Sequence, residues 1–456
     1  MVFNSNVFLF AFLPVVFTAF WLSRTKQQRY VVLTVSGYVF YGYWDWRFCW
    51  LLLFSSVVSF TAGLMIDGAQ SRAAKRTWMV ASVATDLSLL GFFKYYNFVA
   101  GNLARLAPGP APPLLHIVLP IGISFYTFHT ISYIVDVAAG RVRATRSFFE
   151  YLAYVSLFSQ LVAGPIVRFR EIEDDLERID GPPREDHMAR GLGFFAAGLV
   201  KKAVIADSIA GWIEPMLGLP QSLSMAGAWF AALGYAFQLY YDFSGYSDMA
   251  VGLGLMFGLR IPQNFNSPYR ALGIGDFWRR WHMSLSSWLR DYLYISLGGN
   301  RRGEVRTYFN LFVTMALGGL WHGANWTFVV WGAYHGILLA LGRLAGPAFA
   351  PVPDLLKRAG TFLLVLFGWV IFRSSDLSMA ASWLGKMFGL GVGTGAVPGA
   401  LVLWIAVGFL LVNLVPETWD IELGTGRRWA PLYATALLVA YLFVNQQQTV
   451  FLYYQF

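Results

Sequence analysis

Apolar runs separated by short polar connections follow one another along almost the whole chain. Five such runs fill the first third, at residues 7–22, 30–44, 48–66, 78–99 and 114–135. A helix needs roughly 20 apolar residues to cross about 30 Å of hydrocarbon. Further runs lie at residues 151–166, 191–213, 226–259, 308–321, 326–344, 361–372, 400–415 and 432–444. The pattern predicts an all-α, polytopic membrane protein.

The first apolar run is expected to stay in the membrane as a span. It has no basic segment before it and no A-x-A cleavage signal after it, whereas a removed signal peptide carries both. Residues 1–456 are therefore expected to form a single integral-membrane domain.

The charges of the connections alternate. Those after the first, third and fifth runs carry Arg24, Lys26, Arg29, Arg72, Lys75, Arg76, Arg141, Arg143 and Arg146, and those after the second and fourth carry Arg47 and Arg105. Lys and Arg accumulate in cytoplasmic loops, so this alternation places the N-terminus outside. Residues 168–190, which mix both charges with prolines, are expected to be a solvated connection, and the glycine-rich residues 389–399 a flexible loop.

Composition supports a membrane protein. The chain is 57% apolar and only 13% charged, about half the charged share of a soluble protein. The excess of 34 Lys and Arg over 25 Asp and Glu is accounted for by basic loops near anionic lipid headgroups, so no nucleic acid is needed to explain it. The single cysteine, Cys49, excludes a disulfide framework within the chain.

The polar residues that lie within apolar surroundings are concentrated in residues 238–326. Ionisable groups at membrane depth require an internal chamber or protein partners. In QLYYDFSGYSDMA, Gly245 is expected to let the helix break. The motif carries Asp242, Ser244, Tyr246 and Asp248. Such a break would bind an ion, position a donor or line a polar channel, and the residues alone leave these alternatives open.

The segment FWRRWHMSLSSWLRDYLYISL predicts one amphipathic helix lying in the membrane interface. Its apolar stripe, at spacings of three and four, consists of Trp278, Trp281, Leu285, Trp288 and Tyr292. A simple interfacial anchor accounts for these residues and for the arginines. It does not account for His282, which falls on the buried flank and is expected to face the chamber.

Another histidine, His322, lies between glycines in LGGLWHGAN. Missing side chains there let a substrate or a second helix approach the backbone closely. A structural role in the bundle is an equal alternative for His322. For His335, in a regular apolar helix, we favour a simple hydrogen bond within the bundle.

Histidine suits a buried acyl transfer because a neutral imidazole accepts the proton of an alcohol as the alcohol attacks a carbonyl. Other chemistries lack their motifs, since neither G-x-S-x-G nor H-E-x-x-H occurs. The residues therefore predict no metal site.

Several motifs together resemble one known family. DFSGYSDMA, FWRRWHMSLSSWLRDYLYISLGGNRRG and LGGLWHGANWTFVVWGAYHG follow one another in that order, and LPIGISFYTFHTISYIVDV, LVAGPIVRF and GLVKKAVIAD extend the likeness over most of the chain. They resemble the membrane-bound O-acyltransferase family, in the bacterial branch that contains alginate O-acetyltransferases.

The resemblance implies a ring of about eleven transmembrane helices, with interfacial and re-entrant helices, around a central channel. It assigns the catalytic core to residues 226–344, with His322 as the catalytic base and His282 as its assistant. The residues expected to line the substrate channel are Asp242, Ser244, Tyr246, Asp248, Arg279, Arg280, Trp281, Trp321 and Asn325.

The resemblance also implies a function. Acetyl from a cytoplasmic thioester, acetyl-CoA, is expected to cross the bacterial inner membrane to a periplasmic acetyltransferase partner, with no permanently bound cofactor. The acceptor is an extracytoplasmic polysaccharide such as alginate, with peptidoglycan or cellulose as alternatives. In the aromatic tail, residues 445–456, Tyr454 is expected to carry the acyl group, with Tyr453 as its rival. An interfacial aromatic residue is an equal alternative.

Two other classes of function are alternatives to an acyltransferase. Asp86, Lys94 and Asp242 lie in or beside apolar runs, as relay residues of transporters do. A non-catalytic scaffold of an exopolysaccharide secretion complex is the third class.

Overall fold

The computed structural model describes residues 1–106, 112–218, 222–391, 393–424, 429–444 and 452. Within these ranges the regular elements are helices, apart from an isolated bridge between Leu223 and Gly395. The chain divides into two compact units. Unit 1 comprises Met1–Phe195 and Met249–Pro262, and unit 2 comprises Ala196–Asp248, Gln263–Leu423 and the described residues from 429 onward.

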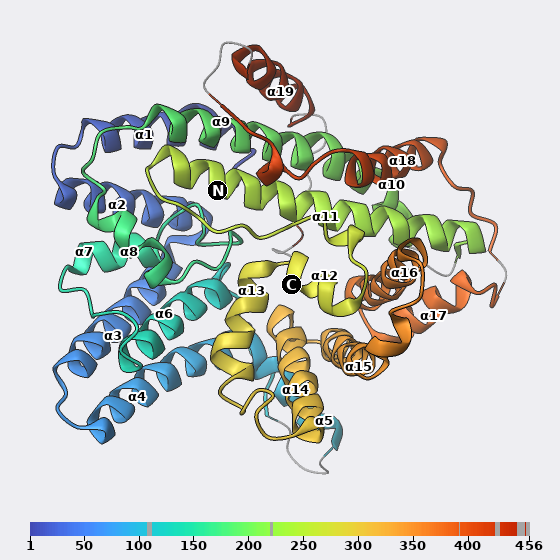
Figure 1. Ribbon diagram of the computed structural model, residues 1–456, viewed down its shortest axis with the longest axis horizontal. Coiled ribbons are helices and arrows are strands. Elements are labelled where there is room, and N and C mark those ends of the chain that lie inside the picture. The colour runs from blue at the N-terminus through green and yellow to red at the C-terminus, as the bar shows by residue number, and fades with distance from the viewer. Residues whose placement is uncertain (107–111, 219–221, 392, 425–428, 445–451, 453–456) are drawn as a thin grey trace. The chain divides into compact units, whose positions relative to one another are not determined.

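Unit 1 contains the first helices (Figure 1). They are α1 (Leu13–Leu22), α2 (Lys26–Asp45), α3 (Cys49–Gly68), α4 (Arg72–Leu90), α5 (Tyr96–Leu106), α6 (Ile123–Ala138), α7 (Phe148–Val155), α8 (Phe169–Glu177) and most of α9 (Glu185–Leu199). Local polar residues define where they begin. Thr25 and Gln28 form a capping box that starts α2, and Ser71 caps α4.

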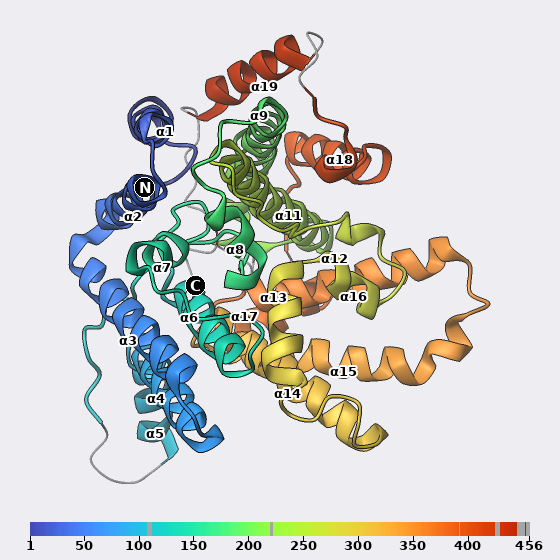
Figure 2. The same cartoon turned by 60° about the vertical axis from the view of Figure 1, so that its left-hand side comes forward.

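A buried carboxylate joins three helices of unit 1. Asp86 of α4 accepts hydrogen bonds from Ser55 of α3 at 2.6 Å and from Thr130 of α6 at 2.8 Å. The three helices lie side by side in both views (Figures 1 and 2). Because an unsatisfied carboxylate in this interior is costly, the two hydroxyls specify how the helices pack.

Unit 2 contains the remaining helices. They are α10 (Asp207–Leu217), α11 (Met225–Met256, of which the last turns belong to unit 1), α12 (Ile274–Arg280), α13 (Met283–Trp288), α14 (Glu304–His322), α15 (Trp326–Phe349), α16 (Asp354–Arg373), α17 (Leu377–Met387), α18 (Gly399–Leu414) and α19 (Trp429–Val444). The π-helical stretches η4 (Val200–Ala206) and η7 (Leu289–Tyr294) and the 3-10 turns η6 (Pro268–Arg270) and η8 (Thr418–Asp420) also belong to unit 2.

Helices α14 and α15 form a close pair in unit 2. A Cβ on Gly319 would lie 2.2 Å from the Phe328 carbonyl oxygen, and one on Gly332 would lie 2.3 Å from that of Met315. Any side chain at these positions would push the helices apart. The sequence expectation that glycines allow a second helix to approach is confirmed at Gly319.

Four helical stretches are long and apolar enough to cross a membrane. They are Lys26–Gly68, Trp326–Gly346, Asp354–Arg373 and Gly399–Asp420, and Phe8–Leu22 and Trp429–Val444 are shorter apolar helices. The all-helical membrane fold is thus confirmed. A ring of about eleven spanning helices stays a prediction.

Two predicted spans are shorter than expected. Helix α6 begins only at Ile123, because Pro112, Pro113 and Pro120 prevent helix in the preceding residues. Helix α7 ends at Val155. The turns that follow it are tight, since a Cβ on Gly164 would lie 2.6 Å from the Ser159 carbonyl oxygen.

Three further expectations about local structure are wrong. The segment 168–190 contains helix α8, which buries Phe169, Ile172 and Leu176, so it is not simply a solvated connection. Helix α17 has no counterpart among the predicted elements. Helix α11 continues through Gly245, where the missing side chain admits the Gly198 carbonyl oxygen, 2.7 Å from an ideal Cβ, rather than breaking the helix.

Candidate active site

The predicted interfacial helix is interrupted at His282. Helix α12 ends at Arg280, Trp281 is extended, and His282 has the left-handed conformation with φ 43° and ψ 54°. A residue other than glycine seldom adopts this region. Helix α13 then begins at Met283, so the apolar stripe read as one helix belongs to two helices and a π-helical turn.

Asn264 holds this interruption in place. Its backbone carbonyl accepts a hydrogen bond from the Met283 amide at 2.9 Å, and its Oδ1 accepts from the amide and the hydroxyl of Ser284 at 3.2 and 2.8 Å. The first turn of α13 is thus capped by a residue distant in sequence. Asn264 was not among the predicted site residues.

The same amide defines the protonation of His282. Asn264 Nδ2 donates to Ser247 Oγ at 3.1 Å, so Oδ1 is the accepting atom, and it lies 3.1 Å from His282 Nδ1. A neutral imidazole in this place carries its proton on Nδ1 and its lone pair on Nε2. The fully buried ring also packs edge-on against Phe243, with centroids 4.7 Å apart. The sequence prediction that His282 lies on a buried flank is confirmed.

His322 is the last residue of α14 and lies among aromatic rings. The centroids of Trp321, Trp331 and Phe372 lie 5.0, 5.2 and 5.2 Å from that of His322. The residue is 5% exposed and lines a cavity of about 480 Å³. The ring is therefore not enclosed in solid packing.

The cavity follows one face of α14. Leu311, Thr314, Met315, Gly318 and His322 line it at spacings of one, three and four residues. The eleven steps along the helix from Leu311 to His322 correspond to about 16 Å, at 1.5 Å per residue. Since Gly318 lines the cavity while Gly319 faces α15, one glycine makes room for a ligand and its neighbour for a helix.

Three arginines also line this cavity. Arg343 lies on α15, twelve residues or about 18 Å of helix beyond Trp331, whose ring contacts His322. The side chains of Arg279 and Arg290 are 73% and 63% exposed, and both have acidic neighbours in sequence. The cavity thus combines a buried imidazole, an apolar wall along α14 and cationic groups.

Of the predicted channel residues, Arg279 is the one that lines the cavity of His322 in the part of the chain that the structure describes. Arg280 forms an ion pair with Asp276 at 3.0 Å. Trp281 packs on Trp369 with centroids 4.8 Å apart. Trp321 contacts the ring of His322.

Asn325, also expected in the channel, lies at the start of α15. Its Oδ1 accepts a hydrogen bond from the Thr327 amide at 3.1 Å, and its Nδ2 donates to the Ser375 carbonyl at 2.6 Å. The first contact caps the helix, and the second joins it to the connection between α16 and α17.

The DFSGYSD motif lies inside unit 2 and does not line the described cavity. Lys202 bonds both Asp242 and Asp207 at 2.7 Å. Its sequence neighbour Lys201 bonds Asp248 at 2.8 Å and Glu417 at 2.9 Å. The other two predicted channel residues of the motif, Ser244 and Tyr246, are buried on α11.

The C-terminal tail reaches the same cluster. The backbone amide of Leu452 donates to Asp242 Oδ2 at 3.0 Å, and Leu452 is buried. Tyr453 and Tyr454 lie outside the described residues. Asp242 thus binds Leu452, which is the one residue of the tail that the structure describes.

His335 is buried in aromatic surroundings, next to Trp331 at 4.9 Å and Trp278 at 5.2 Å between ring centroids. Neither ring nitrogen has a hydrogen-bond partner among the described residues, so the expected bond within the bundle is absent there. In the same ranges, no group of three or more His, Cys, Asp or Glu residues is arranged to hold a metal ion.

Comparison with known proteins places this geometry in context. Residues 38–374 match the sequence model of the membrane-bound O-acyltransferase family. The chain is 49% identical over 399 residues to the protein named "Probable alginate O-acetylase AlgI" of Pseudomonas aeruginosa, covering 86% of this chain and 75% of the relative. It is 38% identical to the peptidoglycan O-acetyltransferase of Helicobacter pylori, covering 86% and 80%. It is 30% identical to the teichoic acid D-alanyltransferase of Bacillus subtilis, covering 51% and 61%.

Proposed function

This chain belongs to the membrane-bound O-acyltransferase family, and we propose that it transfers acetyl from acetyl-CoA on the cytoplasmic side toward a polysaccharide outside the inner membrane. The observation that carries the proposal is the imidazole of His322 in the wall of a cavity of about 480 Å³. The names of the relatives favour alginate as the acceptor, with peptidoglycan or cellulose as alternatives.

His322 acts as the general base. One ring nitrogen takes the proton of the attacking hydroxyl, while the oxygen of that hydroxyl bonds to the thioester carbonyl carbon. When the tetrahedral intermediate collapses, the carbon–sulfur bond breaks and the thiolate takes that proton, which releases CoA and an ester. A positioned base of this kind contributes roughly 10²- to 10⁴-fold in rate.

His282 assists in orienting or stabilising the reacting groups. Its Nδ1 bond to Asn264 directs the lone pair to Nε2, so the ring is held as an acceptor rather than left to exchange tautomers.

The arginines of the cavity bind the anionic end of the donor. Arg343 lies on α15 about 18 Å of helix away from Trp331, which contacts His322. A thioester carbonyl at His322 and phosphates at Arg343 would use both ends of the cavity, with the apolar length of α14 between them.

The outward step uses the C-terminal tail and a periplasmic acetyltransferase partner. The bond between the Leu452 amide and Asp242 supports a defined place for Leu452 in unit 2. Tyr454, two residues later, is the proposed acyl carrier, and the N-terminus is proposed to lie outside.

The polar residues that favoured a transporter have structural partners. Asp86 is bonded to two hydroxyls, and Asp242 is paired with Lys202. Such pairing supports helix packing more than an ion path.

The test is a pair of histidine substitutions in protein reconstituted with acetyl-CoA, the periplasmic partner and an oligosaccharide acceptor. His322→Ala is expected to lower release of free CoA and formation of the acetyl ester at least a hundredfold. The exposed His116 provides the matched control, His116→Ala, which is expected to retain both. Wild-type ester formation by His322→Ala would remove the assignment, and transport of intact solute without CoA release would favour the transporter.

A further inference from the structure

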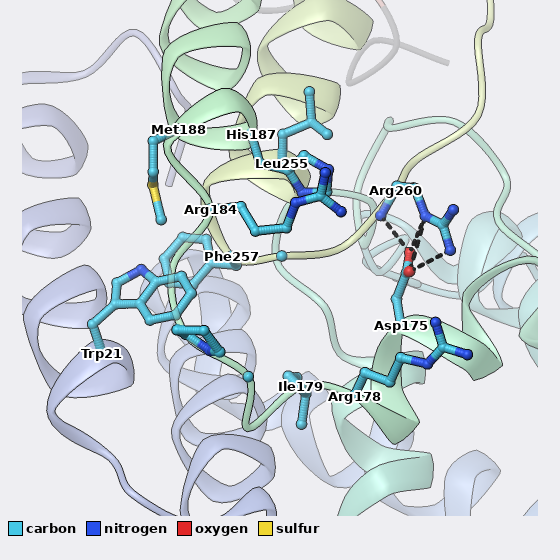
Figure 3. Close-up of a pocket in the computed structure, with 13 residues that line it drawn as sticks. Trp21, Asp175, Arg178, Ile179, Arg184, His187, Met188, Leu255, Phe257 and Arg260 are labelled. Carbon is cyan, nitrogen blue, oxygen red and sulfur yellow. Dashed lines mark hydrogen bonds and ion pairs between the residues drawn. The ribbon is translucent and has the colours of Figure 1, made fainter. Parts of the chain in front are cut away.

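A second cavity, of about 330 Å³, lies within unit 1, and none of its lining residues lines the cavity of His322. It is formed by the last turn of α1, the connection between α8 and α9, and the residues around the end of α11 (Figure 3). The proposed acetyl transfer makes no use of it.

Basic side chains converge on this cavity. Arg178, Arg184 and Arg260 line it together with His187 and one acid, Asp175. With His187 neutral, three arginines and one aspartate give a lining charge of +2. A cavity with this excess of positive charge attracts anions.

The acid in the lining is already neutralised. The Asp175 carboxylate accepts from the Arg260 guanidinium at 2.6 and 2.9 Å and from the Arg260 backbone amide at 2.8 Å, as Figure 3 shows. Arg184 pairs with the exposed Asp186. Arg178 makes no ion pair within the described part of the chain.

The pKa of His187 is lowered below its usual range chiefly by burial. Nearby charges of both signs act on this pKa, since the Arg184 guanidinium lowers it whereas Asp186 and Asp175 raise it. A bound anion would act in the opposite direction and raise that pKa.

The other wall of the cavity is apolar. Trp21, Leu255 and Phe257 line it. The Trp21 indole is fixed by donating to the Met256 carbonyl at 3.2 Å, and the Phe257 ring packs edge-on against Phe20 with centroids 5.1 Å apart. Rigid apolar groups beside cationic ones match a ligand that joins an anionic head to an aliphatic arm.

Arg29 connects the cavity to the basic end of α1. Its guanidinium donates to the carbonyls of Ile179 and Gly181 and lies over the ring of Trp21 at 4.7 Å. The cavity therefore lies at the same end of α1 as the basic connection 23–29, which the charge pattern assigns to the cytoplasmic side. Anionic phospholipid headgroups and soluble phosphate esters both occur there.

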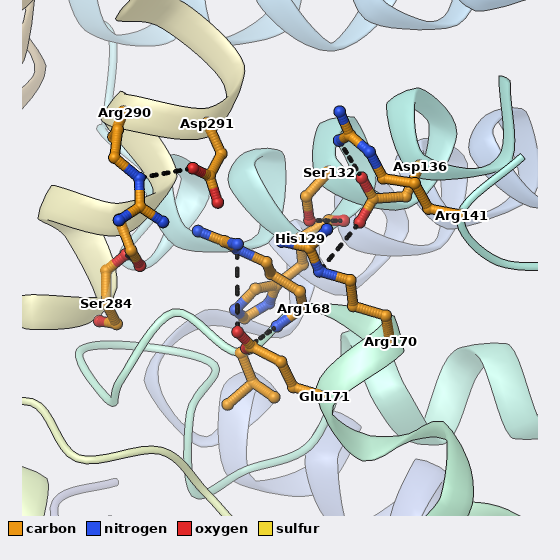
Figure 4. Close-up of polar contacts among 12 residues, drawn as sticks. His129, Ser132, Asp136, Arg141, Arg168, Arg170, Glu171, Ser284, Arg290 and Asp291 are labelled. Atoms are coloured by element: carbon orange, nitrogen blue, oxygen red, sulfur yellow. Dashed lines mark hydrogen bonds and ion pairs between the residues drawn. The ribbon is translucent and has the colours of Figure 1, made fainter. Parts of the chain in front are cut away.

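A second basic cluster of unit 1 does not offer the same site. Figure 4 shows Arg141 and Arg170 directed at Asp136, from which they lie 2.8 and 3.7 Å away. The Arg168 amide bonds Glu171 at 2.9 Å. Asp136 thus pairs with both Arg141 and Arg170, whereas Arg178 at the cavity makes no ion pair within the described residues.

We propose that the unit 1 cavity binds the phosphate ester group of an amphiphile, with the phosphate between Arg178, Arg184 and Arg260 and the aliphatic part against Trp21 and Phe257. A lipid headgroup and a soluble phosphate ester share this chemistry.

The test compares two double variants of the full chain in detergent. Arg178→Gln with Arg184→Gln removes two cavity charges. Arg24→Gln with Lys26→Gln removes two exposed charges from the same end of α1 and is the matched control. One probe is phosphatidylglycerol retained in native mass spectrometry, and the other is the soluble ester n-butyl phosphate followed by calorimetry.

The cavity variant is expected to bind one of the probes about 25-fold more weakly, or about fivefold for each arginine, whereas the control binds as wild type does. Loss of phosphatidylglycerol binding alone identifies the lipid as the source, and loss of butyl phosphate binding alone identifies a soluble ester. Equal losses of probe binding in both double variants would mean that general surface charge accounts for the loss, which would overturn the proposal. Unchanged binding of both probes would also overturn it.

Arg178→Gln alone keeps the experiment decisive if the double variant fails to fold, because Arg178 has no ion pair in the described chain to lose. Its expected loss is about fivefold. Wild-type binding by a folded single variant contradicts the proposal. Since binding is measured directly, failure of the proposed acetyl transfer would leave this result unchanged.

Discussion

The side-chain oxygen of Asn264 lies 3.1 Å from Nδ1 of His282 and also holds the first turn of α13. One amide therefore determines both where the helix begins and which nitrogen of the imidazole carries its proton. Activity and local stability are linked at this residue.

Replacing Asn264 separates these contributions. Asn264→Leu leaves the Nδ1–H of His282 and the Ser284 amide without their acceptor, which costs about 1–3 kcal/mol. We expect a fall in kcat of roughly tenfold or more with a small change in KM, measured by CoA release in reconstituted protein. Asn264→Asp retains an accepting oxygen and is expected to stay within a few-fold of wild type. Equal kcat in the Leu variant and wild type would show that the bond does not matter for catalysis.

Two adjacent glycines of α14 are expected to respond differently to alanine. A Cβ on Gly319 would lie 2.2 Å from the Phe328 carbonyl oxygen, so Gly319→Ala should lower stability by about 1–3 kcal/mol or more. A Cβ on Gly318 would lie 3.0 Å from a flexible leucine methyl, Leu289 Cδ1, and would enter the cavity. Gly318→Ala should therefore fold and raise KM for acetyl-CoA. Thermal unfolding and steady-state kinetics of both variants check the contrast, which fails if both unfold at the same temperature.

Removal of the cavity arginine on α15 is expected to weaken donor binding. Arg343→Gln should raise KM for acetyl-CoA about fivefold, or about 1 kcal/mol, with kcat unchanged, because the lost contact is equal in the ground and transition states. Arg306→Gln is the control, since Arg306 is exposed on the same helix pair but does not line the cavity. If both substitutions raise KM equally, general surface charge is responsible.

The buried ion pairs of unit 2 predict a rescue experiment. Lys202, Asp207 and Asp242 together carry one net negative charge when ionised, and Lys202→Met would leave two buried carboxylates. We expect a loss of about 3–5 kcal/mol of stability. Adding Asp242→Asn returns the net charge to −1 and keeps an acceptor for the Leu452 amide.

The double variant should therefore recover part of the lost thermal stability. Lower stability in the double than in the single variant would mean that the charge balance is not what holds this cluster together.

Sequence patterns predicted most of the helices and their membrane character. Long apolar runs such as 326–344 correspond to α15, because burial of an apolar segment in lipid depends mainly on its own composition. Prolines end helices locally, and those before Ile123 shorten α6 as local chemistry requires. The position of His322 near a glycine, Gly319, that admits a second helix also followed from local sequence.

Only the tertiary structure decided how the polar residues are used. In sequence, Asp242 and Asp248 resemble channel residues, yet Lys201 and Lys202 from η4 pair with them. The stripe through Trp278 and Trp288 has the period of a single helix, but Asn264 caps a new helix after His282. The physical reason is that a buried polar group is stable only with a partner, and its partner is chosen by how distant segments pack, which no local pattern records.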